Sequence, residues 1–120
     1  MTTVRIDHDI PYSVYNMEYI REYIQKLPYP VEEVYIREST GGNTHIKLIV
    51  PVELSPLDEL LIRAIMHDDE RRIRGDLERY ALNSPVFGLL FDEKKFSNGE
   101  HKVCGEWVEI TQEIPPFLMD

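Results

Sequence analysis

The stretch that decides the fold reads VYIRESTGGNTHIKLIVP and covers residues 34–51. It contains two runs rich in β-branched and aromatic residues, and a short segment with two glycines separates them. Such runs are typical of strands, and Gly, Asn and Thr between them are typical of a tight turn. We therefore predict a β-hairpin with strands over Val31–Glu38 and Thr44–Val52 and a turn at Thr40–Asn43.

The residues before this hairpin predict one strand and one helix. Val4-Arg5-Ile6-Asp7 is typical of a short strand, and the strand should end at Ile10-Pro11 because the residue before proline disfavours further regular structure. Apolar residues then recur at helical spacing from Met17 to Leu27, with Asn16 as the expected N-cap. Two prolines, Pro28 and Pro30, end this helix.

The residues after the hairpin predict two further helices and two further strands. Ser55-Pro56 is a helix start, since serine caps the first turn and proline suits the first helical position. Its expected apolar stripe consists of Leu57, Leu60, Leu61, Ala64 and Ile65. Asp68 or Asp69 is expected to cap a third helix, whose buried face would be Ile73, Leu77, Tyr80 and Ala81. Strands are predicted over Val86–Phe91 and Glu106–Ile110, with a turn at Asn98-Gly99.

The predicted order is therefore β-α-β-β-α-α-β-β in a single domain over residues 1–120. This order predicts an α+β fold, with a mainly antiparallel sheet of about 4–5 strands and its helices packed on one face. The arrangement corresponds to an RNA-recognition or ferredoxin-like core.

The composition favours an ordinary globular protein and bears on its partners. The chain has 42% hydrophobic and 29% charged residues, and its apolar runs are too short to span a membrane. With one cysteine, Cys104, it forms no internal disulfide, and we expect a buried or edge thiol in a reducing, cytoplasmic compartment. The net charge of −9 argues against a broadly basic nucleic-acid-binding surface, so such binding would need a local basic cluster or metal ions.

Strand alternation sorts the side chains of the first three strands into two faces. One face is aliphatic and consists of Val4, Ile6, Val34, Ile36, Ile46, Leu48 and Val50. The opposite face collects Arg5, Asp7, Asp9, Tyr35, Arg37, His45 and Lys47. Antiparallel sheets normally have one polar, solvated face. That explanation accounts less well for two aspartates in a strand, because Asp is depleted there.

These residues resemble a known catalytic core. Archaeo-eukaryotic primases, and the polymerase domains of bacterial end-joining ligases, have an Asp-x-Asp pair at the end of a first strand. After a helix they have a hairpin with Ser-Gly-x-x-Gly-x-His. This chain has Asp7-His8-Asp9, and then Ser39-Thr40-Gly41-Gly42-Asn43-Thr44-His45 before a strand that runs to Pro51. The resemblance covers residues 4–66, with Thr40 and Asn43 in place of the two motif glycines.

The resemblance implies a minimal, primase-like nucleotidyltransferase that depends on Mg²⁺ or Mn²⁺. Asp7, Asp9 and a third carboxylate would hold the metal ions and act in catalysis. Asp76 is the first choice for this third residue and Asp92 the alternative. The nucleotide would be bound by Arg37, Ser39, Gly41, Gly42, His45 and Lys47, with the glycine amides cradling phosphate. A viral or mobile-element origin would suit so short a chain.

Other interpretations stay open at this point. The same sheet could act as a non-catalytic module that binds nucleic acid or protein, with Tyr35 stacking on a base. The same carboxylates could instead serve a metal-dependent nuclease. His8, His67 and His101 lack partners at metal-binding spacing and are expected at the surface. The arginines of the third helix, Arg71, Arg72, Arg74 and Arg79, are expected to be ion-paired rather than to contact nucleic acid. The apolar tail Pro115–Leu118 leaves a homodimer open.

Overall fold

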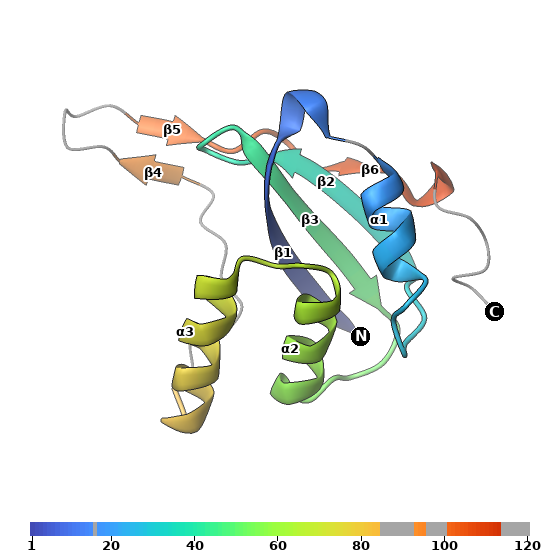
Figure 1. The fold of residues 1–120 in the computed structure, drawn as a ribbon, viewed down its shortest axis with the longest axis vertical. Coiled ribbons are helices and arrows are strands. Elements are labelled where there is room, and N and C mark those ends of the chain that lie inside the picture. Colours follow the sequence, from blue (N-terminus) through green and yellow to red (C-terminus); the bar gives the residue numbers. More distant parts are fainter. Residues whose placement is uncertain (16, 85–92, 96–100, 114–120) are drawn as a thin grey trace.

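The structure is a computed structural model that describes residues 1–15, 17–84, 93–95 and 101–113. Its main feature is an antiparallel sheet of four strands, ordered β1-β3-β2-β6 (Figure 1). These strands are β1 (Thr2–Pro11), β2 (Glu33–Glu38), β3 (Asn43–Val50) and β6 (Val108–Glu109). Two further strands, β4 (Glu93–Lys95) and β5 (His101–Val103), pair with each other in a separate ribbon.

The predicted hairpin is present as β2 and β3, and its turn is stabilised locally. Ser39 N–H donates to the Asn43 carbonyl (2.8 Å), and the Gly42 amide donates to the Ser39 carbonyl (3.0 Å). Gly42 has a φ of +86°, in the left-handed region that glycine adopts without steric cost. The pairing sets Ile36 opposite Ile46 and Val34 opposite Leu48, so the aliphatic residues of both strands share one face.

Three α-helices accompany the sheet: α1 (Met17–Ile24), α2 (Pro56–Ile65) and α3 (Glu70–Ala81). Short 3₁₀ turns, η1 (Tyr12–Val14) and η2 (Thr111–Glu113), follow β1 and β6. The caps of α2 and α3 explain where these helices begin. Ser55 Oγ accepts the Asp58 amide (3.2 Å), and Asp69 Oδ1 accepts the Arg71 amide (2.8 Å).

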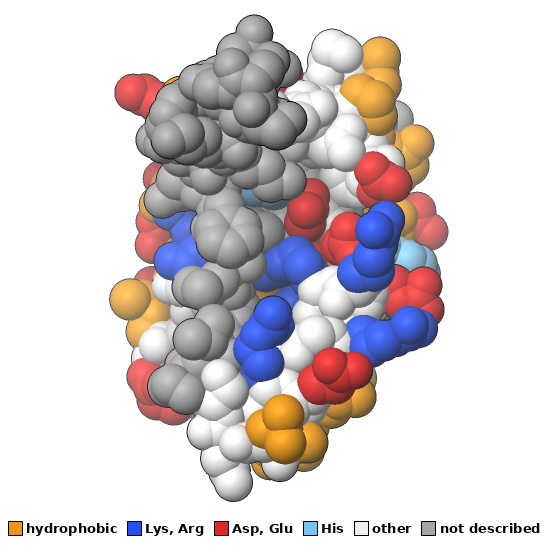
Figure 2. Space-filling model, turned by 90° about the vertical axis from the view of Figure 1, so that its left-hand side faces the viewer, with side chains coloured by type: hydrophobic (Ala, Val, Ile, Leu, Met, Phe, Trp, Pro, Cys, Tyr) orange, Lys and Arg blue, Asp and Glu red, His pale blue; other side chains and the backbone are white. Residues whose placement is uncertain are grey.

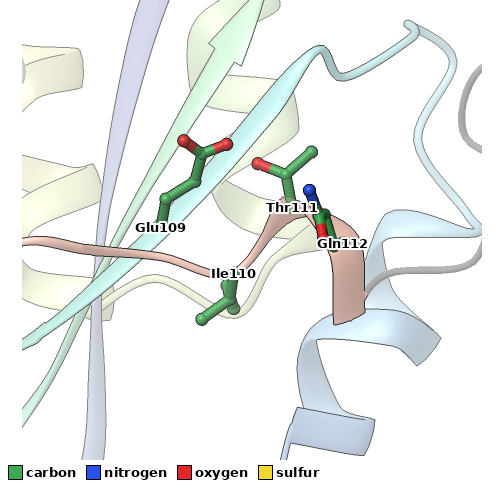
Figure 3. Close-up of a pocket in the computed structure, with 4 residues that line it drawn as sticks. All are labelled: Glu109, Ile110, Thr111 and Gln112. Atoms are coloured by element: carbon green, nitrogen blue, oxygen red, sulfur yellow. The ribbon is translucent and has the colours of Figure 1, made fainter.

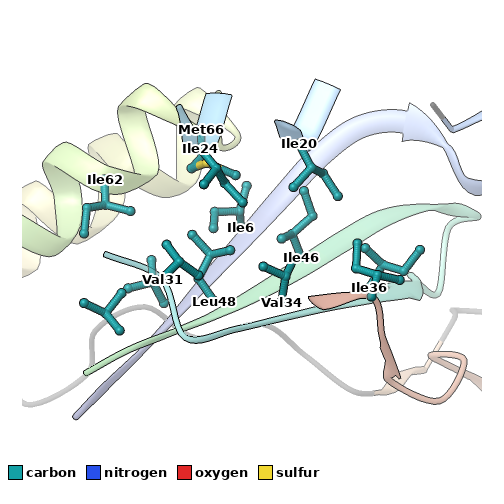
Figure 4. Close-up of a cluster of buried hydrophobic side chains, with 13 residues drawn as sticks. Ile6, Ile20, Ile24, Val31, Val34, Ile36, Ile46, Leu48, Ile62 and Met66 are labelled. Carbon is teal, nitrogen blue, oxygen red and sulfur yellow. The ribbon is translucent and has the colours of Figure 1, made fainter. Parts of the chain in front are cut away.

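The hydrophobic core lies between one face of the sheet and helices α1 and α2 (Figure 4). The predicted aliphatic face is confirmed, because all seven of its residues are at most 5% exposed. Helix α1 contributes Ile20 and Ile24, and the α2 segment contributes Ile62 and Met66. The opposite face of the sheet is left for the polar residues.

The α+β class and its antiparallel sheet are confirmed, whereas the fuller ferredoxin-like order stays a prediction. Several bounds differ: β1 extends over Thr2–Pro11, α1 ends at Ile24, and the last strand is confined to Val108–Glu109. Asn16, the Val86–Phe91 strand, the Asn98-Gly99 turn and the tail from residue 114 lie outside the described residues.

The predicted buried faces of α2 and α3 are wrong in large part. Leu57 and Leu61 are half-exposed, and so are Leu77 and Tyr80 of α3. The buried side chain of α3 is Asp76, since this helix packs against α2 through the ion pair of Asp76 with Arg63 instead of lying on the sheet. Helical spacing shows which residues share a stripe, but not what faces that stripe.

His8 also corrects a prediction, because it is 2% exposed and not a surface residue. It shares the inner face of β1 with Val4 and Ile6, and its ring nitrogens contact the Tyr15 hydroxyl and the Met66 carbonyl. His67, by contrast, is exposed as expected. Within the described part of the chain, no helix has the length and apolar character that crossing a bilayer requires.

Candidate functional site

The polar face of the sheet is organised in two rows that cross three strands. In one row Arg37 on β2, His45 on β3 and Asp7 on β1 stand opposite one another. In the next row the register aligns Tyr35, Lys47 and Arg5. Residues paired across antiparallel strands point to the same face, so all six side chains share one surface. The structure therefore brings together most of the residues that the sequence placed on this face.

The first row is a chain of polar contacts under partial cover. Arg37 Nε donates to His45 Nδ1 (3.0 Å), and His45 Nε2 lies 3.8 Å from Asp7 Oδ1. Because a guanidinium only donates, His45 Nδ1 must carry no proton here, and a neutral ring then has its N–H on Nε2, toward Asp7. Arg37 is 4% exposed and His45 is 5% exposed, which is unusual for the outer face of a sheet.

Trp107 provides much of this cover, and the sequence interpretation missed it. The Arg37 guanidinium lies 4.2 Å from the centroid of the Trp107 ring, and Lys47 Nζ lies 4.7 Å from it. Lys47 Nζ is also 4.7 Å from the Tyr35 centroid, so two aromatic rings flank one ammonium group. A sequence signal for the side on which Trp107 lies was available. Glu109 pairs with Tyr35 of the polar face, and side chains two residues apart along an extended chain point to the same side.

Cys104 lies at the margin of the same row. Its Sγ is 4.0 Å from His45 Nδ1, and the residue is partly exposed. This partly exposed position at the margin agrees with the prediction that Cys104 is a buried or edge thiol.

Asp7 is a titratable group whose environment differs strongly from water. Burial, together with the negative charges of Asp68, Asp69 and Asp9, raises the pKa of Asp7 to about 6, although the Arg72 guanidinium acts to lower it. Its carboxyl therefore carries a proton over part of the range in which an ordinary aspartate is ionised.

Lys47 and Tyr35 in the second row are also shifted. Burial, together with the positive charges of Arg5 and Arg37, lowers the pKa of Lys47. The hydrogen bond from the Tyr35 hydroxyl to Glu33 Oε1 (2.5 Å) is the main cause that raises the pKa of Tyr35 to about 12. The cations of this row repel one another, and an anion bound between them would relieve that repulsion.

The glycine loop is shaped differently from a phosphate cradle. The amides of Gly42 and Asn43 are both used by Ser39, through its carbonyl (3.0 Å) and its Oγ (3.0 Å) respectively. The loop borders an open hollow lined by Glu38, Ser39, Thr40, Gly41, Gly42 and Val103. The Glu38 carboxylate faces this hollow near Gly42, and its charge opposes an incoming phosphate there. Ser39 and Gly41 therefore lie close to the two rows but outside them.

The three predicted metal-binding aspartates occupy different places. Asp9 follows Asp7 along β1, where the register with β3 shifts between His8 and Pro11, and its Oδ1 accepts from Asn43 Nδ2 (2.8 Å). Asp76 lies on α3, 3% exposed, and binds Arg63 (2.7 Å) and Arg79 (2.8 Å).

The described residues do not by themselves complete a two-metal centre. No three His, Cys, Asp or Glu side chains in the described part of the chain are grouped so that they could hold a metal ion. Both carboxylate oxygens of Asp76 are occupied by arginines, which makes it a partner of cations already present in the fold. Asp92, the alternative third carboxylate, lies outside the described residues.

The remaining surface offers weaker candidates. A second hollow, at the end of β6 and the start of η2, is lined by Glu109, Ile110, Thr111 and Gln112 (Figure 3), and none of these was predicted to act in binding. On the side of the molecule shown in Figure 2, Lys and Arg side chains alternate with Asp and Glu. The arginines of α3 follow this pattern, since Arg74 lies 3.9 Å from Glu70 and Arg72 binds Asp68 (2.5 Å).

Comparisons with known proteins give no match for this chain among family models, curated proteins or solved structures. Its function is therefore inferred from the chemistry of its own side chains.

Proposed function

We propose that this protein binds the phosphates and bases of a nucleotide or single-stranded nucleic acid on the polar face of its sheet. The observation that carries the proposal is the stack of Arg37 and Lys47 against Trp107, with the second side of Lys47 against Tyr35. It combines the two kinds of group that such ligands need. Cations attract phosphate, and aromatic rings stack on bases.

The charge distribution supports a local site of this kind. The whole chain carries a net charge of −9, yet Arg5, Arg37 and Lys47 stand together on one surface. A cluster of three cations on an acidic protein concentrates its positive potential in one place, which favours an anionic ligand there.

The burial of Arg37 and His45 argues against a merely solvated face. A solvated strand residue extends its charge into water, whereas both of these side chains are held under the 104–107 segment at 4% and 5% exposure. Their orientation is fixed before a ligand arrives, so a ligand would lose less of its binding energy in ordering them.

The fluorescence of Trp107 gives a direct test, because it is the single tryptophan of the chain. We expect a nucleoside triphosphate, and a short single-stranded oligonucleotide, to change this fluorescence with saturation. The variant Lys47→Met should weaken binding about tenfold, since one charge-assisted contact is worth roughly 1.5–3 kcal/mol.

The matched control is Lys26→Met, which removes the same charge from the turn after α1, where Lys26 is exposed and lies 3.9 Å from Glu22. It should bind as the unmodified protein does. Equal weakening by both variants would show a non-specific charge effect, and no weakening by Lys47→Met would refute the proposed face.

Metal-dependent nucleotidyl transfer is a second candidate function, and one observation favours it. Asp7 stands opposite His45 of the hairpin, and Asp9 is close enough for its charge to raise the pKa of Asp7. Calorimetric titration with Mn²⁺ and a nucleoside triphosphate tests it. If Asp7→Ala binds Mn²⁺ as well as the unmodified protein does, both the transferase and the nuclease hypotheses fail. If Asp7 is needed, primer extension and strand cleavage assays would separate these two activities.

A further inference from the structure

Asp68, in the turn between α2 and α3, has no exposed side-chain surface and accepts hydrogen bonds from four donors. Its Oδ2 accepts from Arg63 Nε (2.7 Å). Its Oδ1 accepts from Arg72 (2.5 Å), from the Asp69 amide (2.9 Å) and from the Asp7 amide (2.7 Å). A buried carboxylate is costly unless donors surround it, and here they do.

The contact with Asp7 joins this turn to the side of β1 that faces away from β3. The Asp7 amide donates to Asp68, and the Asp7 carbonyl accepts from the Asp69 amide (3.0 Å). Arg72 also donates to the Arg5 carbonyl (3.2 Å). The backbone of β1 from Arg5 to Asp7 is thus held on one side by β3 and on the other by the turn.

This second support lies where the first one weakens. The pairing of β1 with β3 changes register between His8 and Pro11, so the hydrogen-bond ladder between these two strands becomes irregular just past His8. Arg5 and Asp7 supply the β1 side of the polar face. A shift of the strand edge would therefore move two of the six side chains in the two rows.

We propose that Asp68 is a positioning residue, which holds β1 so that Arg5 and its neighbours face the ligand of the polar face. This inference rests on the proposed function, and it adds a residue that touches no ligand. It also gives a role to this buried ion-pair cluster. Such clusters often add little net stability, because burying the charges costs about as much as their attraction gains.

Electrostatics and positioning predict opposite results for Asp68→Ala. Removing a negative charge near a phosphate site would by itself strengthen the binding of a nucleoside triphosphate. Loss of the strand support would weaken it, and we expect about fivefold weaker binding in the Trp107 fluorescence titration, within the coupling found inside one hydrogen-bond network. Asp68→Asn keeps an oxygen that can accept from the Asp7 amide, so its affinity for the nucleotide should lie between those of Asp68→Ala and the unmodified protein.

A double-mutant cycle with Arg5→Met tests whether Asp68 acts through the strand. Arg5→Met should weaken binding in the unmodified protein and have little further effect in the Asp68→Ala background. If Asp68 only stabilises the fold, Arg5→Met keeps its full effect in both backgrounds, and the inference is overturned. Tighter binding by Asp68→Ala would overturn it as well.

Ser55→Ala is the control for a loss of stability, because it removes only the cap of α2 (Asp58 amide to Ser55 Oγ, 3.2 Å). Circular dichroism would verify that each variant is folded at the titration temperature, and Asp68→Asn serves as the test if Asp68→Ala is not. The two proposals fail separately. Absence of binding by the unmodified protein would refute the proposed function, whereas normal binding without coupling between Arg5 and Asp68 would refute only the positioning role.

Discussion

Asp7, His8 and Asp9 are consecutive residues that meet three different environments. Asp7 is partly covered on the polar face, His8 is buried under the helices, and Asp9 is exposed beside Asn43. Strand alternation separates His8 from its neighbours, and the register shift after His8 separates Asp7 from Asp9. The chemical role of each residue therefore depends on its position along β1 more than on the motif that they form together.

Asp7 should reduce the stability of the fold at neutral pH. Its folded-state pKa of about 6 lies above the ordinary value of 3.8, so the unfolded chain ionises first as the pH rises. The contribution of Asp7 to the free energy of unfolding is most favourable below pH 3.8, and this contribution is lost as the pH rises through about 6. Asp7→Asn should thus be more stable than the unmodified protein at pH 7.5, by roughly 1–3 kcal/mol, and nearly equal to it at pH 3.5.

Urea unfolding of both proteins at the two pH values measures this difference. His8 does not disturb the comparison, although burial lowers its pKa and acid destabilises the fold through it, because both proteins contain it. A variant that is less stable than the unmodified protein at pH 7.5 would contradict the prediction.

At the scale of elements, ion pairs rather than apolar contacts join α3 to the rest of the fold. Arg63 of α2 has no exposed side-chain surface and binds Asp68 and Asp76, both at 2.7 Å. Asp76 and Asp68 are thereby neutralised on the two sides of one guanidinium. This bridge between two carboxylates suits arginine, whose planar guanidinium presents several donors in fixed directions, whereas a lysine ammonium is a single point charge.

Arg63→Met should destabilise the protein by about 3–5 kcal/mol, since it leaves two buried carboxylates without their shared cation. The control Arg74→Gln, which removes an exposed pair with Glu70 (3.9 Å), should change the stability by less than about 0.5 kcal/mol. Urea unfolding at pH 7.5 compares the two. Equal stabilities of Arg63→Met and the unmodified protein would show that α3 is held by other contacts.

For the whole molecule, charge has opposite effects at long and short range. The net charge of −9 repels a nucleic acid, while the three cations of the polar face attract it on contact. Contacts of about three cations with a single strand predict a slope near −2 in log affinity against log salt concentration. A threefold rise in salt should then weaken binding roughly tenfold.

Titration with the oligonucleotide, followed by Trp107 fluorescence at about 50 and about 150 mM salt, measures this slope. A variant such as Arg5→Met should make the slope shallower by somewhat less than one unit. Affinity that does not change with salt would mean that stacking, and not phosphate contact, dominates the interaction.

The sequence by itself determined the α+β class, the hairpin, the cap at Ser55 and the division of the sheet into two faces. These features depend on local chemistry: side-chain alternation, turn residues and helix caps act between near neighbours in the chain. The faces of the aliphatic and polar side chains in the three long strands could be predicted for the same reason, whereas that of His8 was not.

Only the tertiary structure decided what the polar face is made of and what supports it. Trp107 reaches Arg37 across 70 residues of sequence, and Asp68 reaches the Asp7 amide across 61. The family resemblance made Asp76 the first choice for a third metal-binding carboxylate, yet Arg63 holds it in a buried ion pair. Contacts between distant segments depend on how the elements pack, and no local pattern contains that information.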